Sequence, residues 1–181
     1  PGVPACLLIT ADKGLAGAYN QNVIRQGQQL MAEHPGTALY VVGEYGRRWF
    51  AQRGVPVEKS FLYTAQNPTL DRARHIAELL LDRFDAGEIN SVWIIYTDMK
   101  NGLEATVHQA QVMPLHRERF HAATAATAGD AVYEFVPSAK AVLDNAARSC
   151  LTGYIYSALV DSFCSEQSAR MTAMNAADQN A

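Results

Sequence analysis

The stretch Ala5-Cys6-Leu7-Leu8-Ile9-Thr10 is a continuous apolar run of strand length. Such a run is typical of a strand that is covered on both faces, as in a parallel sheet. A glycine-containing turn follows it. Residues 20–34 then carry apolar side chains at helical spacing until Pro35 and Gly36 end the pattern. Strand, turn and helix together predict the first unit of an α/β fold.

The same alternation continues to residue 136 and predicts helices packed over a mostly parallel sheet. Strands are predicted at 38–42, 91–97 and 131–136, a weak edge segment at 55–61, helices at 44–53 and 70–84, and a loop at 116–130. Thr69 or Asp71 is the expected cap of the helix at 70–84. Residues 106–115 alternate apolar and polar side chains, which favours an antiparallel edge strand with one wet face.

Residues 138–181 contain no proline and a single glycine, Gly153, so they are predicted to form one helix. At about 1.5 Å per residue such a helix reaches roughly 66 Å, which exceeds the width of the preceding domain. Its end must therefore leave the domain and meet another helix. An apolar seam is expected along it, at Leu143, Ala147, Cys150, Tyr154, Ala158, Val160, Phe163, Ala169, Met171, Met174 and Ala177.

The overall composition is that of one globular domain with an appendage. The 181 residues carry a formal charge of −3, and 49% of them are apolar. A protein that holds nucleic acid through phosphate contacts usually shows a clustered basic excess, so nucleic-acid binding is not expected. Three cysteines without a CxxC pair favour free thiols, and no apolar run is long enough to span a membrane. Because the chain starts at Pro1 and stops inside a helical pattern, we expect it to be a piece of a longer protein.

The turn after the first strand is the segment most similar to a phosphate-binding site. Gly14 and Gly17 fit neither Gly-x-Gly-x-x-Gly nor the phosphate loop Gly-x-x-x-x-Gly-Lys-Ser/Thr. The structural interpretation is that the glycines permit a tight turn while Asn20 caps the following helix. No Gly-x-Ser-x-Gly elbow is present, and His116 and His121 are spaced wrongly for a metal site on one helix face. We therefore predict no catalytic, cofactor-binding or metal-binding residues.

Two segments at opposite ends of the chain resemble the gamma subunit of the F-type, rotary ATP synthases. Residues 165–177, Ser-Glu-Gln-Ser-Ala-Arg-Met-Thr-Ala-Met-Asn-Ala-Ala, resemble the family signature in their Ser-Glu, Ala-Arg-Met and Ala-Met steps. Residues 12–20 are similar to the family's Asp-Arg-Gly-Leu-Cys-Gly-Gly-Leu-Asn, from which Lys13, Ala16, Ala18 and Tyr19 depart. Residues 133–137 lie where the family has a Tyr-rich strand followed by proline.

The resemblance implies the middle of a gamma subunit. Residues 1–137 would form a Rossmann-like three-layer domain, and 138–181 the start of the central-shaft coiled coil. Such a rotor subunit catalyses no reaction itself. It couples rotation of the c ring to ATP synthesis or hydrolysis in the ring of alpha and beta subunits, and it also binds epsilon. The complex would place it on the inner, cytoplasmic face of the bacterial cell membrane.

The resemblance also implies contact residues. Glu166, Arg170 and Asn175 are candidates for contacts with the catalytic beta subunits, and Tyr133 and Phe135 for the foot that meets the c ring and epsilon. The structural alternative for the three helix residues is a solvated helix face. For Tyr133 and Phe135 it is a position in the core.

Two alternative functions remain at this point: a small-ligand- or nucleotide-binding Rossmann-like domain, suggested by the Gly14 turn, and a helical adaptor unrelated to the synthase. The exposed seam near Met171 and Met174 could also pair with a second copy of the chain.

Overall fold

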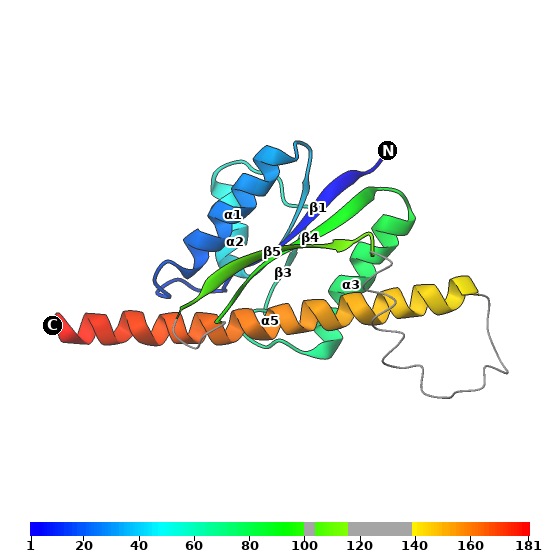
Figure 1. Ribbon diagram of the computed structural model, residues 1–181. Coiled ribbons are helices and arrows are strands. Elements are labelled where there is room, and N and C mark those ends of the chain that lie inside the picture. The colour runs from blue at the N-terminus through cyan, green and yellow to red at the C-terminus, as the bar shows by residue number, and fades with distance from the viewer. Residues whose placement is uncertain (100–103, 116–138) are drawn as a thin grey trace, which may run out of the picture.

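The computed structural model describes residues 1–99, 104–115 and 139–181. In chain order the elements are β1 (Val3–Ile9), α1 (Tyr19–Glu33), β2 (Ala38–Val42), α2 (Glu44–Gln52), β3 (Lys59–Phe61), α3 (Leu70–Asp85), β4 (Ile89–Asp98), β5 (Thr106–Met113) and α5 (Ala139–Gln179). The strands form one sheet in the order β3-β2-β1-β4-β5 (Figure 1).

The sheet is mostly parallel, which confirms the predicted fold class. β1 pairs in parallel with β2 and with β4, so that Leu7 lies between Tyr40 and Ile94. β3 continues the parallel part at one edge, and β5 is the antiparallel strand at the other, as its alternating sequence predicts. The weak segment at 55–61 shortens to three residues in β3. Thr69 is the cap of α3, because its side chain accepts a hydrogen bond from the Arg72 backbone N–H at 3.2 Å.

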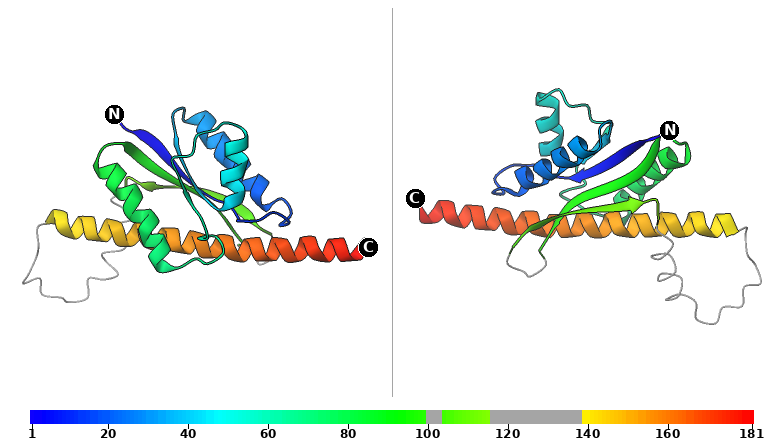
Figure 2. Two further views of the ribbon diagram at one scale, coloured as in Figure 1. Left: turned by 180° about the vertical axis from the view of Figure 1, so that it is seen from behind. Right: turned by 45° about the horizontal axis from the view of Figure 1, so that its top comes forward.

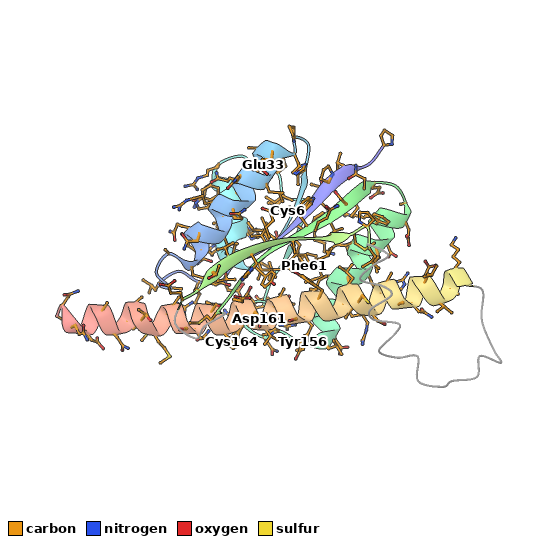
Figure 3. All side chains as sticks on the ribbon, in the orientation of Figure 1. Cys6, Glu33, Phe61, Tyr156, Asp161 and Cys164 are labelled. Atoms are coloured by element: carbon orange, nitrogen blue, oxygen red, sulfur yellow. The ribbon has the colours of Figure 1, made fainter. Side chains whose placement is uncertain are left out.

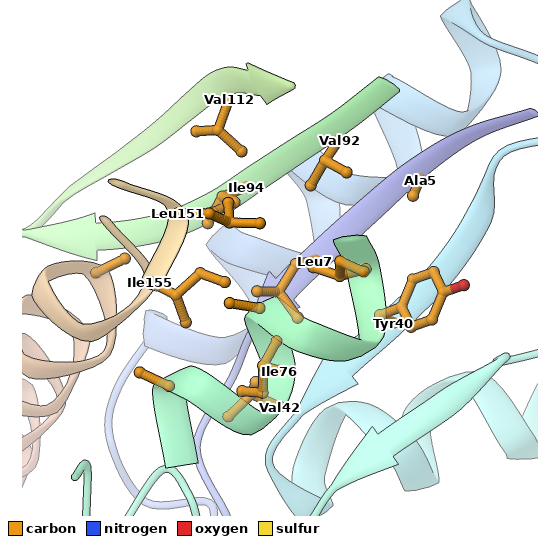
Figure 4. Packing of buried hydrophobic residues seen from close by; sticks show 14 of the residues in the cluster. Ala5, Leu7, Tyr40, Val42, Ile76, Val92, Ile94, Val112, Leu151 and Ile155 are labelled. Atoms are coloured by element: carbon orange, nitrogen blue, oxygen red, sulfur yellow. The ribbon is translucent and has the colours of Figure 1, made fainter. Parts of the chain in front are cut away.

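Helices cover both faces of this sheet, so β1 is buried on both sides. Ala5, Leu7 and Ile9 point into the core that α3 and α5 close (Figure 4). Cys6 and Leu8 point into the second core, which α1 and α2 close. Figure 2 shows the resulting three layers from behind, with α1 and α2 on one face and α3 and α5 on the other. The continuous apolar sequence of β1 follows from this double burial.

Helix α5 is part of the core and also extends beyond it. Its middle turns pack against α3 and β4 through Leu151, Ile155 and Leu159, each at most 1% exposed. Its C-terminal turns run past the sheet, and there Met171 and Met174 are 65% and 59% exposed (Figure 1). The predicted departure of the helix from the domain is confirmed.

The predicted apolar seam of α5 is wrong at Leu143 and Cys150, which are exposed. The stripe that is buried includes polar residues that the seam left out, namely Thr152, Ser162 and Ser165. Small hydroxyl side chains can lie buried against a sheet when they find hydrogen-bond partners, as Ser165 does in the Asp161 carbonyl at 2.8 Å. A count of apolar residues does not detect such positions.

Several predictions fall on residues outside the described part of the chain. These are the loop at 116–130, the strand at 131–136 and the candidate foot residues Tyr133 and Phe135. Within the described part, no helix is long and apolar enough to cross a membrane. All three cysteines are free: Cys6 is buried in the sheet, whereas Cys150 and Cys164 are exposed on α5 (Figure 3).

Candidate functional site

The loop that follows β1 lies against the C-terminal part of α5. Nη1 of Arg170 donates a hydrogen bond to the Gly14 carbonyl oxygen at 2.6 Å, across 156 residues of sequence. The loop spans residues 10–18, and we refer to it as the β1–α1 loop. Two of the three segments that resemble the family pattern therefore touch each other in the fold.

Arg170 is held by Glu166, which lies one helical turn before it. Nη2 of Arg170 donates to Oε1 of Glu166 at 2.7 Å, and the two side chains are only 22% and 6% exposed. Burial raises the pKa of Glu166, while the hydrogen bond and the positive charge of Arg170 act in the opposite direction. The carboxylate is thus buried with one cationic partner, and that partner also binds the loop.

Tyr19 makes the apolar part of the same contact. Its side chain is 5% exposed and packs with Ala11, Ala16 and Ala169 in a small cluster between the loop and α5. Burial raises the pKa of its hydroxyl above the ordinary value for tyrosine. Sequence reasoning did not select Tyr19 as a site residue. The available signal was its departure from the family pattern, which has leucine at this position.

Asn20 has a different role from the predicted one. Helix α1 begins at Tyr19, its cap position is Ala18, and no side chain caps it. The Asn20 carbonyl oxygen instead accepts a hydrogen bond from the Ala11 N–H at 2.9 Å, and its amide donates to the Lys13 carbonyl at 3.4 Å. Because Asn20 lies inside the first turn, its side chain points back to the loop and binds the backbone of two residues in its first half.

The tip of the loop is a tight turn that requires one of the two glycines. Gly17 has φ of +59°, a conformation that suits a residue without a side chain. An added Cβ at Gly14 would meet only the Tyr45 ring, at an ordinary 3.7 Å. Leu15 has φ of +63°, and its side chain is 86% exposed. The loop is thus anchored at its base and presents an apolar side chain at its tip.

A depression of about 480 Å³ lies beside the loop, at the carboxyl ends of β1, β2 and β3, where parallel sheets often bind ligands. Its lining residues are Asp12, Lys13, Glu44, Arg47, Arg48, Leu62, Tyr63 and Gln66. The first turn of α2, to which a phosphate could bind, already has an anionic partner: Oδ1 of Asp12 accepts from the Glu44 N–H at 3.0 Å. Hydrogen bonds from Arg47 and Arg48 lower the pKa of Glu44 to about 2, so both guanidinium groups are also engaged. These contacts argue against a nucleotide site.

A polar cluster at the end of β4 also escaped prediction. Nε2 of His108 lies 2.9 Å from Oδ1 of Asp98, and the His108 ring stacks on Tyr96 with the centroids 5.4 Å apart. Burial raises the pKa of Asp161 on α5, and the nearby charge of Asp98 raises it further. The residues come from two strands and a helix far apart in sequence, so no local pattern marks them. Among the described residues, no group of His, Cys, Asp or Glu side chains is arranged to hold a metal ion.

The five predicted contact residues do not form one group in the structure. Glu166 and Arg170 lie side by side in the contact with the loop. Asn175 lies further along α5 and is exposed. Tyr133 and Phe135 lie outside the described residues.

Comparison with known proteins matches nearly the whole chain to the family that the sequence segments resemble. A family model described as ATP synthase matches residues 3–181. The ATP synthase gamma chain of Caldanaerobacter subterraneus subsp. tengcongensis is 44% identical, over 97% of this chain and 61% of that protein. The gamma chain of Moorella thermoacetica is 38% identical, over 97% of this chain and 60% of that protein. The chain thus spans about three fifths of the length of these relatives.

Solved structures of similar fold come from the same complex. The central stalk and c-ring structure of Tetrahymena thermophila mitochondrial ATP synthase contains a chain with 27% identity and a TM-score of 0.76, matched over 98% of this chain and 77% of that one. A rotor structure of Euglena gracilis mitochondrial ATP synthase matches 99% of this chain and 67% of its own, with a TM-score of 0.70. At 16% identity, the second match supports the fold alone.

Proposed function

Since the chain belongs to the ATP synthase gamma family, we propose that it is part of a central-stalk subunit that passes rotation between a membrane c ring and the catalytic alpha and beta subunits. One observation carries this proposal: α5 is built into the core of the domain and then continues beyond it. The subunit itself has no catalytic centre in this proposal, and catalysis belongs to the alpha and beta ring.

A rotor has to transmit torque without slipping between its shaft and its globular part. The contacts of α5 with α3 and β4 fix the middle of the helix to the sheet. The Arg170 contact with Gly14 fixes a position three to four turns further along, where the helix leaves the core. A helix held at two separated regions resists rotation about its own axis better than one held at a single region.

We place the contact with the catalytic beta subunits on the exposed side of the same region. Asn175 is solvent-exposed on the projecting part of α5, and Arg170 is 22% exposed beside the loop. Glu166 acts through Arg170, because its carboxylate is 6% exposed and holds the guanidinium group. Leu15 adds an exposed apolar side chain at the tip of the loop.

Tyr133 and Phe135 belong to the proposed foot of the subunit, which meets epsilon and the c ring. This is the part of the proposal that the isolated chain can test, because the contact needs only the globular domain. Calorimetric titration with the epsilon subunit of the same organism should show saturable one-to-one binding. Binding should weaken when Tyr133 and Phe135 are replaced by alanine, and a folded chain that binds no epsilon would contradict this assignment.

In the complete complex the subunit is peripheral, on the inner face of the bacterial cell membrane, attached through the c ring. Residues 1–137 then serve as the globular domain and 138–181 as the start of the shaft. The exposed Met171 and Met174 side chains suit a partner helix in that shaft. In the isolated chain we expect them to pair with a second copy, which sedimentation equilibrium would detect as a concentration-dependent dimer.

The full-length gamma chain, assembled with alpha and beta subunits, tests the rotor function directly. A bead attached to the globular domain should rotate when ATP is added. Asn175→Ala should lower the torque, whereas Asn145→Ala, an exposed asparagine near the start of the same helix, should not. Assembly without rotation would refute the rotor function, and equal torque in both variants would remove Asn175 from the contact with the beta subunits.

A further inference from the structure

Tyr19 is the large apolar side chain in the contact between the β1–α1 loop and α5. Its ring packs against Ala11 and Ala16 of the loop and against Ala169 of the helix. The small alanine side chains leave room for an aromatic ring, and burying it removes a large apolar area from water. A leucine, the residue of the family pattern at this position, would fill less of that space and would carry no polar atom.

The α5 side of this contact is itself joined to the sheet. Oγ of Ser162 on α5 accepts a hydrogen bond from the backbone N–H of Thr97 at 3.2 Å, and Thr97 belongs to β4. A loop that packs on α5 through Tyr19 is thereby connected to the core of the domain.

The neighbouring residue holds the other side of the loop. Asn20 accepts from the Ala11 N–H at 2.9 Å, and Arg170 donates to the Gly14 carbonyl at 2.6 Å. The loop is thereby tied to α1 by Asn20 and to α5 by both Arg170 and Tyr19. Of these three side chains, Tyr19 is the one that makes an apolar contact with α5.

We propose that Tyr19 is a positioning residue of this chain: it seats the β1–α1 loop on α5 so that loop and helix move as one body and Leu15 stays presented at the tip. The inference rests on the proposed function for its role in transmitting torque, and on the contacts alone for the seating of the loop.

Hydrogen exchange in the full-length gamma chain tests the seating. Tyr19→Leu removes the aromatic ring and should speed exchange of the amides of residues 11–18 about fivefold, which corresponds to a loss of about 1 kcal/mol of packing. Exchange in β1 and β4 should not change. Tyr19→Phe is the matched control: it keeps the ring that packs between the loop and α5, so exchange of the same amides should stay near the wild-type rate.

The position of the faster exchange separates this contact from a general loosening of the domain. Unchanged loop exchange in Tyr19→Leu, or equally faster exchange in β1 and β4, would overturn the proposed seating.

The role in transmission is measured in membrane vesicles that contain the assembled complex. Tyr19→Leu should lower the number of protons pumped for each ATP hydrolysed, whereas Tyr19→Phe should leave it unchanged. An unchanged ratio with faster loop exchange would overturn the role in transmission. A wild-type chain that does not assemble into a rotor would contradict the proposed function, and the exchange result would still decide whether Tyr19 seats the loop.

Discussion

Replacing Arg170 with alanine should destabilise the domain by about 3 kcal/mol at neutral pH. The substitution removes a charged hydrogen bond to the Gly14 carbonyl, a type that contributes about 1.5–3 kcal/mol. It also leaves the Glu166 carboxylate, 6% exposed, without its cation, and breaking a buried pair in this way costs about 3–5 kcal/mol. The two free-energy ranges count partly the same interactions, so they are not added. Because Arg170 is 22% exposed, we take the lower end of the second range.

The loss should depend on pH with a definite sign. Burial already raises the pKa of Glu166 above 4.5, and Arg170 is the group that opposes this shift. Without Arg170 the pKa of Glu166 in the folded state rises further, so the free energy of folding favours the protonated form. This contribution to stability is fully present below the pKa that Glu166 has in the unfolded chain, and it is lost as pH rises through its pKa in the folded protein. Arg170→Ala should therefore be less destabilising at pH 5 than at pH 7.5.

Urea unfolding followed by circular dichroism at the two pH values measures both effects. Glu166→Gln in the Arg170→Ala background should recover part of the lost stability at pH 7.5, because it removes the unpaired charge. Arg148→Ala is the matched control on the same helix. Arg148 lies 3.9 Å from Asp82 with both side chains well exposed, so its loss should cost less than about 1 kcal/mol. Equal losses for the Arg170 variant at both pH values, or no more than the control, would refute this reasoning.

Three further predictions concern packing, thiol access and a surface carboxylate. Gly46→Ala should lower the free energy of unfolding by about 1–3 kcal/mol, since its Cβ would lie 2.7 Å from the Thr10 hydroxyl, whereas Gly153→Ala meets open space and should raise it by about 0.5–1 kcal/mol; urea unfolding compares the two. Cys6, buried and with its pKa raised to about 12, should resist a thiol reagent at pH 8 while the two cysteines of α5 react, which mass spectrometry can count; labelling of all three in the folded chain would contradict the buried core. The carboxyl carbon signal of Glu44 should titrate with a pKa of about 2 in NMR, and the stability from its arginine partners should be lost as pH falls from the ordinary glutamate value towards 2; a midpoint near 4.5 would show that the pairs do not form in solution.

The fold could be predicted because its signals are local. The apolar run of β1, the aromatic and β-branched residues of β4 and the alternation of β5 each report how many faces of the strand are covered. The absence of proline after residue 138 is likewise sufficient to predict a long helix. The buried stripe of α5 was harder, because Ser162 and Ser165 lie inside for hydrogen bonding rather than for their hydrophobicity.

The candidate site could not be predicted as a site because its contacts join distant segments. Glu166 and Arg170 stood out through the family resemblance, but nothing in their spacing shows that Arg170 binds the Gly14 carbonyl. The prediction that Asn20 caps the following helix was wrong, because helix α1 begins one residue before it. A cap faces forward along its helix, whereas a residue inside the first turn can reach back to the loop.

The orientation of the β1–α1 loop explains why a turn with two glycines is not a phosphate site here. A phosphate loop directs backbone N–H groups towards its ligand, as an anion requires. In this chain the Ala11 N–H is bound by Asn20, and the Gly14 carbonyl oxygen accepts a hydrogen bond from Arg170. Asp12 adds a carboxylate at the first turn of α2. Carbonyl and carboxylate oxygens attract a guanidinium group and repel a phosphate. The same turn geometry therefore binds a helix of its own chain, and the nucleotide-binding alternative loses the feature that suggested it.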